Sequence, residues 1–179
     1  MNIKILDKDV WELIRPVNVL EIKCIDDEDG NLLTDLCKEK QKICNILNIK
    51  QIPCMYLIGN FPFGTCNPEG LYKNHNIYIP FNRESMFFIL AHELFHAYQH
   101  ENKLLADKIE HEKEAVSFAY AYCCLGEQEK KMEIPVIEHL CRQQVFPKDI
   151  LDDHDENDRI PRIIKEKAVE YYNKYLNAV

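Results

Sequence analysis

The sequence predicts an α+β protein in which a small mixed or antiparallel sheet packs on a bundle of helices. Short alternating segments bounded by Gly, Pro and Asn cluster before residue 81, and long segments with apolar residues at helical spacing follow. Strands grouped ahead of helices are typical of this class. The 179 residues match one domain of roughly 150 residues, so we expect a single domain over residues 1–179.

The N-terminal part of the chain alternates between predicted strands and helices. Charged and apolar residues alternate at its start, and apolar residues with Lys and Glu between them recur at helical spacing later. An acidic segment that ends in Gly30 is typical of a turn. We therefore expect a strand over 1–6, a short helix over 7–14, a strand over 17–25, a turn over 26–30 and a helix over 32–47.

Residues 53–80 have a different composition, with three of the five glycines and four of the eight prolines of the chain. These residues interrupt short apolar and aromatic runs, which is typical of strands joined by tight turns. We expect strands over 54–58, 70–72 and 76–79, with turns at 67–68 and 73–74.

Helices are predicted for nearly all of the chain after residue 80. Apolar residues at helical spacing predict helices over 85–100, 110–125, 134–144 and 160–176. The acidic run at 152–158 lacks the spacing and the central Gly of an EF-hand, so we expect a solvated loop there.

The composition excludes two classes of protein. Lys and Arg number 22 against 30 Asp and Glu, for a formal net charge of −8, which argues against nucleic acid as a partner. No apolar run approaches the roughly 18 to 20 residues that span a bilayer, which argues against a membrane protein. The N-terminus lacks the apolar region of a secretory signal, so we expect a cytoplasmic protein whose eight cysteines are reduced.

The segment Ala91–His96 contains an HExxH motif. On a helix, His92 and His96 lie one turn apart on one face and can direct their imidazole nitrogens at one point. Glu93 lies about 100° away around the helix, so it can act as a general base beside a metal rather than as a ligand. The flanking residues are apolar, and burying two imidazoles and a carboxylate together is unfavourable unless a cation compensates them.

A hydrolytic zinc site needs a third protein ligand and an open fourth position. His100 is a poor candidate, because its face has rotated by about 80° from that of His92. The predicted helix over 110–125 offers Glu112 and Glu114, and both lie on apolar faces. Periodicity does not decide between these two carboxylates.

The predicted strand 76–79, the segment 88–96 and the segment 112–119 together resemble the ImmA/IrrE metallopeptidase family. The resemblance covers about residues 30 to 125. It implies a gluzincin-like Zn²⁺ site with His92, His96 and Glu112 as ligands, Glu93 as general base, and hydrolysis of peptide bonds in a protein or peptide substrate. It also implies a substrate such as a transcriptional regulator, for example a repressor of a mobile element. The sequence departs from the family where Phe95 replaces Gly and Val116 replaces Asn or Asp.

Other features of the mechanism stay open in the sequence. An oxyanion donor is needed, and the candidates are Tyr98, Tyr120, Tyr122, His75, His100 and His111. The predicted strand 76–79 could pair with an extended substrate by β-addition. Two alternative functions are a zinc hydrolase of a small amide and a non-catalytic binding protein that a metal stabilises.

Overall fold

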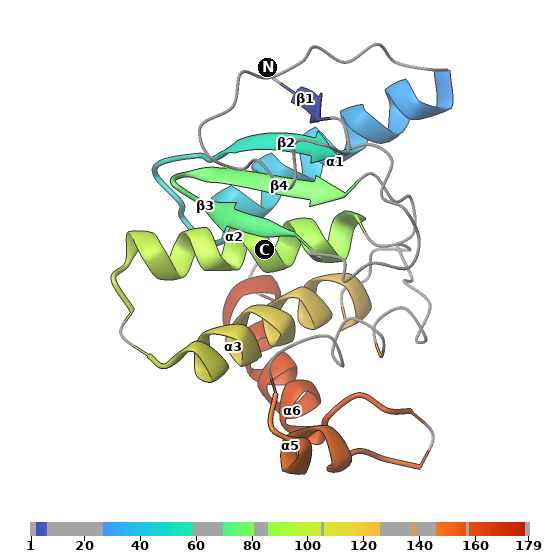
Figure 1. The fold of residues 1–179 in the computed structure, drawn as a ribbon, viewed down its shortest axis with the longest axis vertical. Helices are drawn as coiled ribbons and strands as arrows, with labels where there is room; N and C mark the ends of the chain where they lie inside the picture. The colour runs from blue at the N-terminus through green and yellow to red at the C-terminus, as the bar shows by residue number, and fades with distance from the viewer. Residues whose placement is uncertain are drawn as a thin grey trace.

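Four strands form one mixed sheet in the order β1-β2-β4-β3. The structure is a computed structural model that describes residues 3–6, 27–58, 70–80, 86–104, 106–125, 138, 146–156 and 158–177. The strands are β1 (Ile3–Leu6), β2 (Cys54–Ile58), β3 (Leu71–Lys73) and β4 (Asn76–Pro80). β1 and β4 run parallel to β2, whereas β3 runs antiparallel to β4. The sheet lies on a set of helices (Figure 1), which confirms the predicted α+β class.

The alternation of side chains fixes which face of the sheet is buried. Met55, Ile77 and Ile79 are at most 1% exposed and belong to the hydrophobic core. Tyr56 and Tyr78 point to the opposite face, where they are register partners and their rings stack with centroids 5.1 Å apart. The core therefore lies between the sheet and the helices.

A two-residue turn at Asn74 and His75 joins β3 to β4. Both residues have positive φ, 51° and 60°, as a type I′ hairpin turn requires. β4 lies between β2 and β3, so the hypothesis that the strand 76–79 pairs with a substrate is wrong: both of its edges are occupied. The outer edge belongs to β3, which lies along α2 (Met86–Glu101).

The helix α1 (Asp27–Ile46) begins five residues before the helix over 32–47 that the sequence predicts. The acidic segment expected to form a turn is helical from Asp27 onwards. Acidic residues are favoured at the N-terminus of a helix by its dipole, so they are compatible with a helix start as well as with a turn. The helix ends in a Schellman motif, in which Asn48 has a φ of 53° and the Ile49 N–H donates to the Cys44 carbonyl.

The remaining helices confirm the predictions over 110–125 and 160–176. α3 (Lys108–Tyr120) packs along α2, is capped by the Asp107 side chain, and continues as a π-helical turn, η2 (Ala121–Leu125). α6 (Arg162–Tyr171) packs on α3 and continues as the π-helical turn η3 (Tyr172–Leu176), and a short helix, α5 (Lys148–Asp152), precedes it. α2, α3 and α6 thus stack below the sheet in Figure 1.

Phe95, which stands where the ImmA/IrrE pattern has Gly, ties this stack together. Its ring lies 5.0 Å from that of Phe118 on α3 and 5.3 Å from that of Tyr171 on α6, centroid to centroid. It is 1% exposed. The large side chain therefore fills the junction of three helices behind the HExxH motif.

Several predicted elements lie outside the described residues. They are the helices over 7–14 and 134–144, the strand over 17–25 and the turn at 67–68. Only Glu138 of the helix over 134–144 is described. The five cysteines in the described part are not in disulfides. No helix in that part is long and apolar enough to cross a membrane. The acidic run after α5 is non-helical, and its Asp155 and Asp158 form ion pairs with Lys165.

Candidate metal centre

The two histidines of the HExxH motif face each other in the middle of α2. Their Nε2 atoms lie 3.0 Å apart, and their rings meet edge to face with centroids 4.7 Å apart. His92 is only 7% exposed. The helix therefore directs both imidazoles at one point, as the spacing of four residues predicts.

Glu112 brings a carboxylate from α3 to the same point. Its Oε2 lies 3.3 Å from the Nε2 of His92 and 3.3 Å from the Nε2 of His96. Burial by itself raises the pKa of Glu112, but hydrogen bonds and charge from the two histidines outweigh burial and lower the pKa far below its ordinary value. Glu112 is thus the carboxylate that joins the two histidines, in a group that could hold a metal ion.

The distances between the three donor atoms fit a small divalent ion. Zinc binds imidazole nitrogen and carboxylate oxygen at about 2.0 to 2.2 Å, and the edge of such a tetrahedron is about 3.3 Å long. The observed separations of 3.0, 3.3 and 3.3 Å match that edge. Within the described residues the group has three protein donors, which leaves one corner of a tetrahedron without a protein ligand.

Gln99, which the sequence analysis missed, fixes the tautomer of His96. Its amide nitrogen donates to the backbone carbonyl of His111 and to the carboxylate of Glu114, so its Oε1 must act as an acceptor. That Oε1 lies 2.8 Å from the Nδ1 of His96. The Nδ1 therefore carries the proton of the neutral ring, and the Nε2 lone pair is left to bind a metal. The spacing of three residues between His96 and Gln99 is the signal that could have identified this partner.

Glu114, the alternative third ligand, is occupied elsewhere. Its carboxylate accepts hydrogen bonds from Gln99 and from the Tyr171 hydroxyl, and it forms an ion pair with Lys167 at 3.4 Å. These partners lie on the side of α3 that faces α2 and α6. Glu114 thus accepts a hydrogen bond from Gln99, the partner of His96, and does not join the ligand group.

Glu93 lies beside the ligands, against β3. It is 4% exposed, and the backbone N–H of Tyr72 donates to its carboxylate. Tyr72 and Ile77 form the second residue pair from the two-residue turn. At this pair the backbone N–H and C=O of Tyr72 point away from β4, to the outer edge of the sheet. A Cβ atom at position 70 would lie 2.6 Å from the Glu93 Oε1. Only glycine therefore lets the backbone of residue 70 lie so close to the Glu93 carboxylate.

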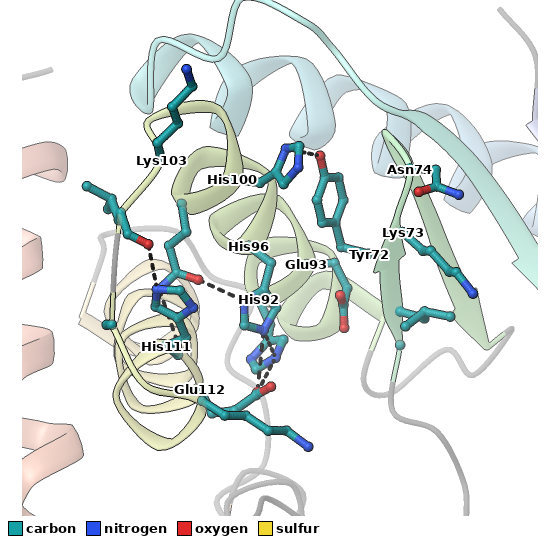
Figure 2. Close-up of a pocket in the computed structure, with 16 residues that line it drawn as sticks. Tyr72, Lys73, Asn74, His92, Glu93, His96, His100, Lys103, His111 and Glu112 are labelled. Carbon is teal, nitrogen blue, oxygen red and sulfur yellow. Dashed lines mark hydrogen bonds and ion pairs between the residues drawn. The ribbon is translucent and has the colours of Figure 1, made fainter.

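Burial raises the pKa of Glu93 above its ordinary value, and the nearby charges of His92 and His96 offset only part of that increase. Figure 2 shows this carboxylate on the β3 side of the ligand group. Glu93 is therefore held next to the ligands without joining them.

Some of the residues predicted as oxyanion donors lie in the site, and others lie away from it. Of these, His100 and His111 line the cleft over the ligands, together with Tyr72, which the sequence analysis had not considered for the site. The Tyr72 hydroxyl bonds to His75 and His100, and the His111 ring bonds to the Leu104 carbonyl. Two candidates have partners away from the cleft, with Tyr98 on Tyr175 and Tyr122 on Glu39.

The ligand group lies at the base of a cleft of about 880 Å³ between β3 and the connection from α2 to α3. Figure 2 shows Tyr72, Lys73 and Asn74 on the β3 side and Lys103 and His111 on the opposite side. Among the residues that the structure describes, the site is thus an open trough rather than a closed pocket.

Comparisons of the chain with protein-family models, with curated proteins and with solved structures gave no match. The resemblance to the ImmA/IrrE family therefore stays a prediction, and the geometry of the site carries the functional argument.

Proposed function

We propose that this chain is a zinc-dependent metallopeptidase of the ImmA/IrrE type. One observation carries the proposal: a buried glutamate that is not a ligand lies beside three donor atoms spaced for a small divalent ion, at the base of an open cleft. The three ligands would be His92, His96 and Glu112. When bound, Zn²⁺ would polarise the scissile carbonyl and lower the pKa of water towards about 7.

Glu93 would act as the general base in this mechanism. Its carboxylate would accept the proton of the attacking water and pass it to the leaving nitrogen. The Tyr72 N–H and the close contact with Gly70 would hold the carboxylate in position for both transfers.

The edge strand favours a peptide over a small amide as the substrate. β3 has no strand on its outer side among the described residues, and this side borders the cleft. An extended peptide could add to this edge through the main-chain groups that are still unbonded, since the outward N–H of Tyr72 already donates to Glu93. By the resemblance to ImmA/IrrE, we extend the proposal to a regulatory protein, such as a repressor of a mobile element, as the substrate.

An element-specific metal measurement on the purified protein, followed by a peptide-hydrolysis assay, tests the proposal. We expect about one zinc per chain, hydrolysis that a chelator abolishes, and a Glu93→Gln variant that keeps its zinc and its folding but loses hydrolysis. Full hydrolysis by the zinc-loaded Glu93→Gln protein would refute the role of Glu93. Zinc without hydrolysis of any peptide would instead indicate a metal-stabilised binding protein.

A further inference from the structure

Three lysines line the cleft that contains the ligand group: Lys73, Lys103 and Lys108. All three are exposed, and no carboxylate of the described residues forms an ion pair with any of them. Lys113 and Lys167, in contrast, form ion pairs with Glu110 outside the cleft. The cleft thus presents cationic groups that no part of the described protein neutralises.

Two of these lysines lie at helix ends, at positions where other residue types are usually found. Lys103 has a φ of 51° at the Schellman end of α2, where glycine is the usual residue. Lys108 is the first residue of α3, where the helix dipole disfavours a cation. Local stability therefore does not account for a lysine at either position.

The acidic residues of the cleft do not balance this charge. Among the described residues that line it, the only carboxylates are Glu93 and Glu112. Both lie at the base of the cleft, and a divalent ion there would offset their two charges. The part of the cleft that carries the three lysines would then stay positively charged, although the formal net charge of the chain is −8.

We propose that the cleft selects acidic peptide segments, in which Asp or Glu side chains lie near the bond to be cleaved. This inference rests on the proposed function and names the substrate class of the same site. Lys73 lies at the end of the edge strand and Lys103 on the connection between α2 and α3, on opposite sides of the trough (Figure 2). Lys108, the first residue of α3, also lines the cleft. The formal net charge of −8 disfavours an acidic segment on the protein as a whole, so the unpaired lysines of the cleft favour binding there.

A binding experiment tests the inference independently of hydrolysis. The probe is a fluorescein-labelled mixture of ten-residue peptides with Asp and Glu around a central Phe-Leu pair, and its counterpart carries Asn and Gln instead. Both are titrated into the Glu93→Gln protein, which would not cleave them, and fluorescence anisotropy gives Kd. Each peptide is made with a free and an amidated C-terminus, which separates side-chain carboxylates from the terminal carboxylate.

We expect the acidic peptides to bind at least about tenfold more tightly than the amide peptides, with either terminus, and to lose most of this preference between about 50 mM and about 500 mM salt. Lys73→Gln, Lys103→Gln and Lys108→Gln should each weaken acidic binding by about twofold to fivefold, and leave amide binding unchanged. Lys148→Gln is the matched control for Lys108→Gln, because Lys148 is also an exposed first residue of a helix but lies outside the cleft.

Equal binding of acidic and amide peptides would overturn the inference, and so would an equal loss in Lys148→Gln. A preference that disappears on C-terminal amidation would also overturn it, in favour of recognition of the chain end. Acidic peptides that bind but are never cleaved by the zinc-loaded wild-type protein would overturn the proposed function and leave the acidic preference standing. The two failures are therefore distinguishable.

Discussion

The Oε1 of Gln99 lies 2.8 Å from the Nδ1 of His96, on the side of the imidazole that faces away from Glu112. This contact begins a chain of interactions that leads from the metal ligands through Glu114 to Lys167 and Tyr171 on α6. The orientation of one ligand therefore depends on the packing of three helices.

Replacing Gln99 by Leu should weaken metal binding. The variant removes the acceptor that keeps the proton on the Nδ1 of His96, and loss of such a partner typically lowers metal affinity by about 10-fold to 100-fold. Competition with a chromogenic chelator measures the change. Gln51→Leu is the control, because Gln51 is exposed and outside the cleft. Unchanged affinity in Gln99→Leu would show that the tautomer does not need this partner.

Glu112→Ala and Glu114→Ala should have different effects. Glu112→Ala removes a ligand, so we expect the purified protein to contain little metal. Glu114→Ala should keep its metal, bound more weakly, and lose about 1 to 3 kcal/mol of unfolding free energy because Gln99 and Lys167 lose their partner. Metal analysis and urea unfolding distinguish the two variants. Loss of metal from Glu114→Ala alone would contradict our ligand assignment.

Gly70→Ala should impair hydrolysis without loss of metal. The added methyl group would lie 2.6 Å from both the Glu93 Oε1 and the Ile89 Cγ2, so the carboxylate must move. A misplacement of about 1 Å can lower kcat by about 100-fold, and we expect a loss of that order. Metal content should stay at the wild-type level, and amide hydrogen exchange at Tyr72 should become faster as its bond to Glu93 is lost. Wild-type exchange at Tyr72 would show that Glu93 has not moved.

The ion pairs of Glu110 should make stability depend on pH. Partial burial raises the pKa of Glu110, but Lys113 and Lys167 outweigh burial and lower the pKa below 4.5. A lowered pKa in the folded state stabilises the protein above the ordinary value, and this contribution is lost as the pH falls through the folded-state pKa.

Glu110→Gln should therefore lower the unfolding free energy by about 1 kcal/mol at pH 7, and by progressively less as the pH falls below 4.5. Urea unfolding at several pH values measures the difference. Glu166→Gln, at an exposed position on α6, is the control and should have little effect at any pH. A difference for Glu110→Gln that stays constant down to about pH 3 would contradict the ion-pair explanation.

Most of the architecture around the site follows from local sequence patterns. The strands at 54–58 and 76–79 and the helix with His92 and His96 were predicted almost to the residue, because alternation and helical spacing are strong there. The start of α1 at Asp27 was missed, since an acidic run suits both a turn and a helix N-terminus. The order of the strands could not be predicted, because it depends on contacts between segments far apart in the chain.

The sequence identified the two histidines on α2 that could hold a metal ion, but not every residue of the site. Periodicity left Glu112 and Glu114 equivalent, since both faces of that helix are apolar, and only the packing of α3 against α2 distinguishes them. The role of Gly70 depends on the close approach of β3 to Glu93, which local sequence does not encode. Tyr72 and Gln99 carry no motif of their own and acquire their roles from their neighbours.

The connection between α2 and α3 is fastened to the ligand helix at several points. The His111 ring bonds to the Leu104 carbonyl, the His111 carbonyl accepts from Gln99, and the Leu104 N–H donates to the Gln99 carbonyl. The same glutamine thus steadies both a ligand and the segment that bears Lys103. A substitution at Gln99 would therefore disturb the orientation of His96 and one wall of the cleft at the same time.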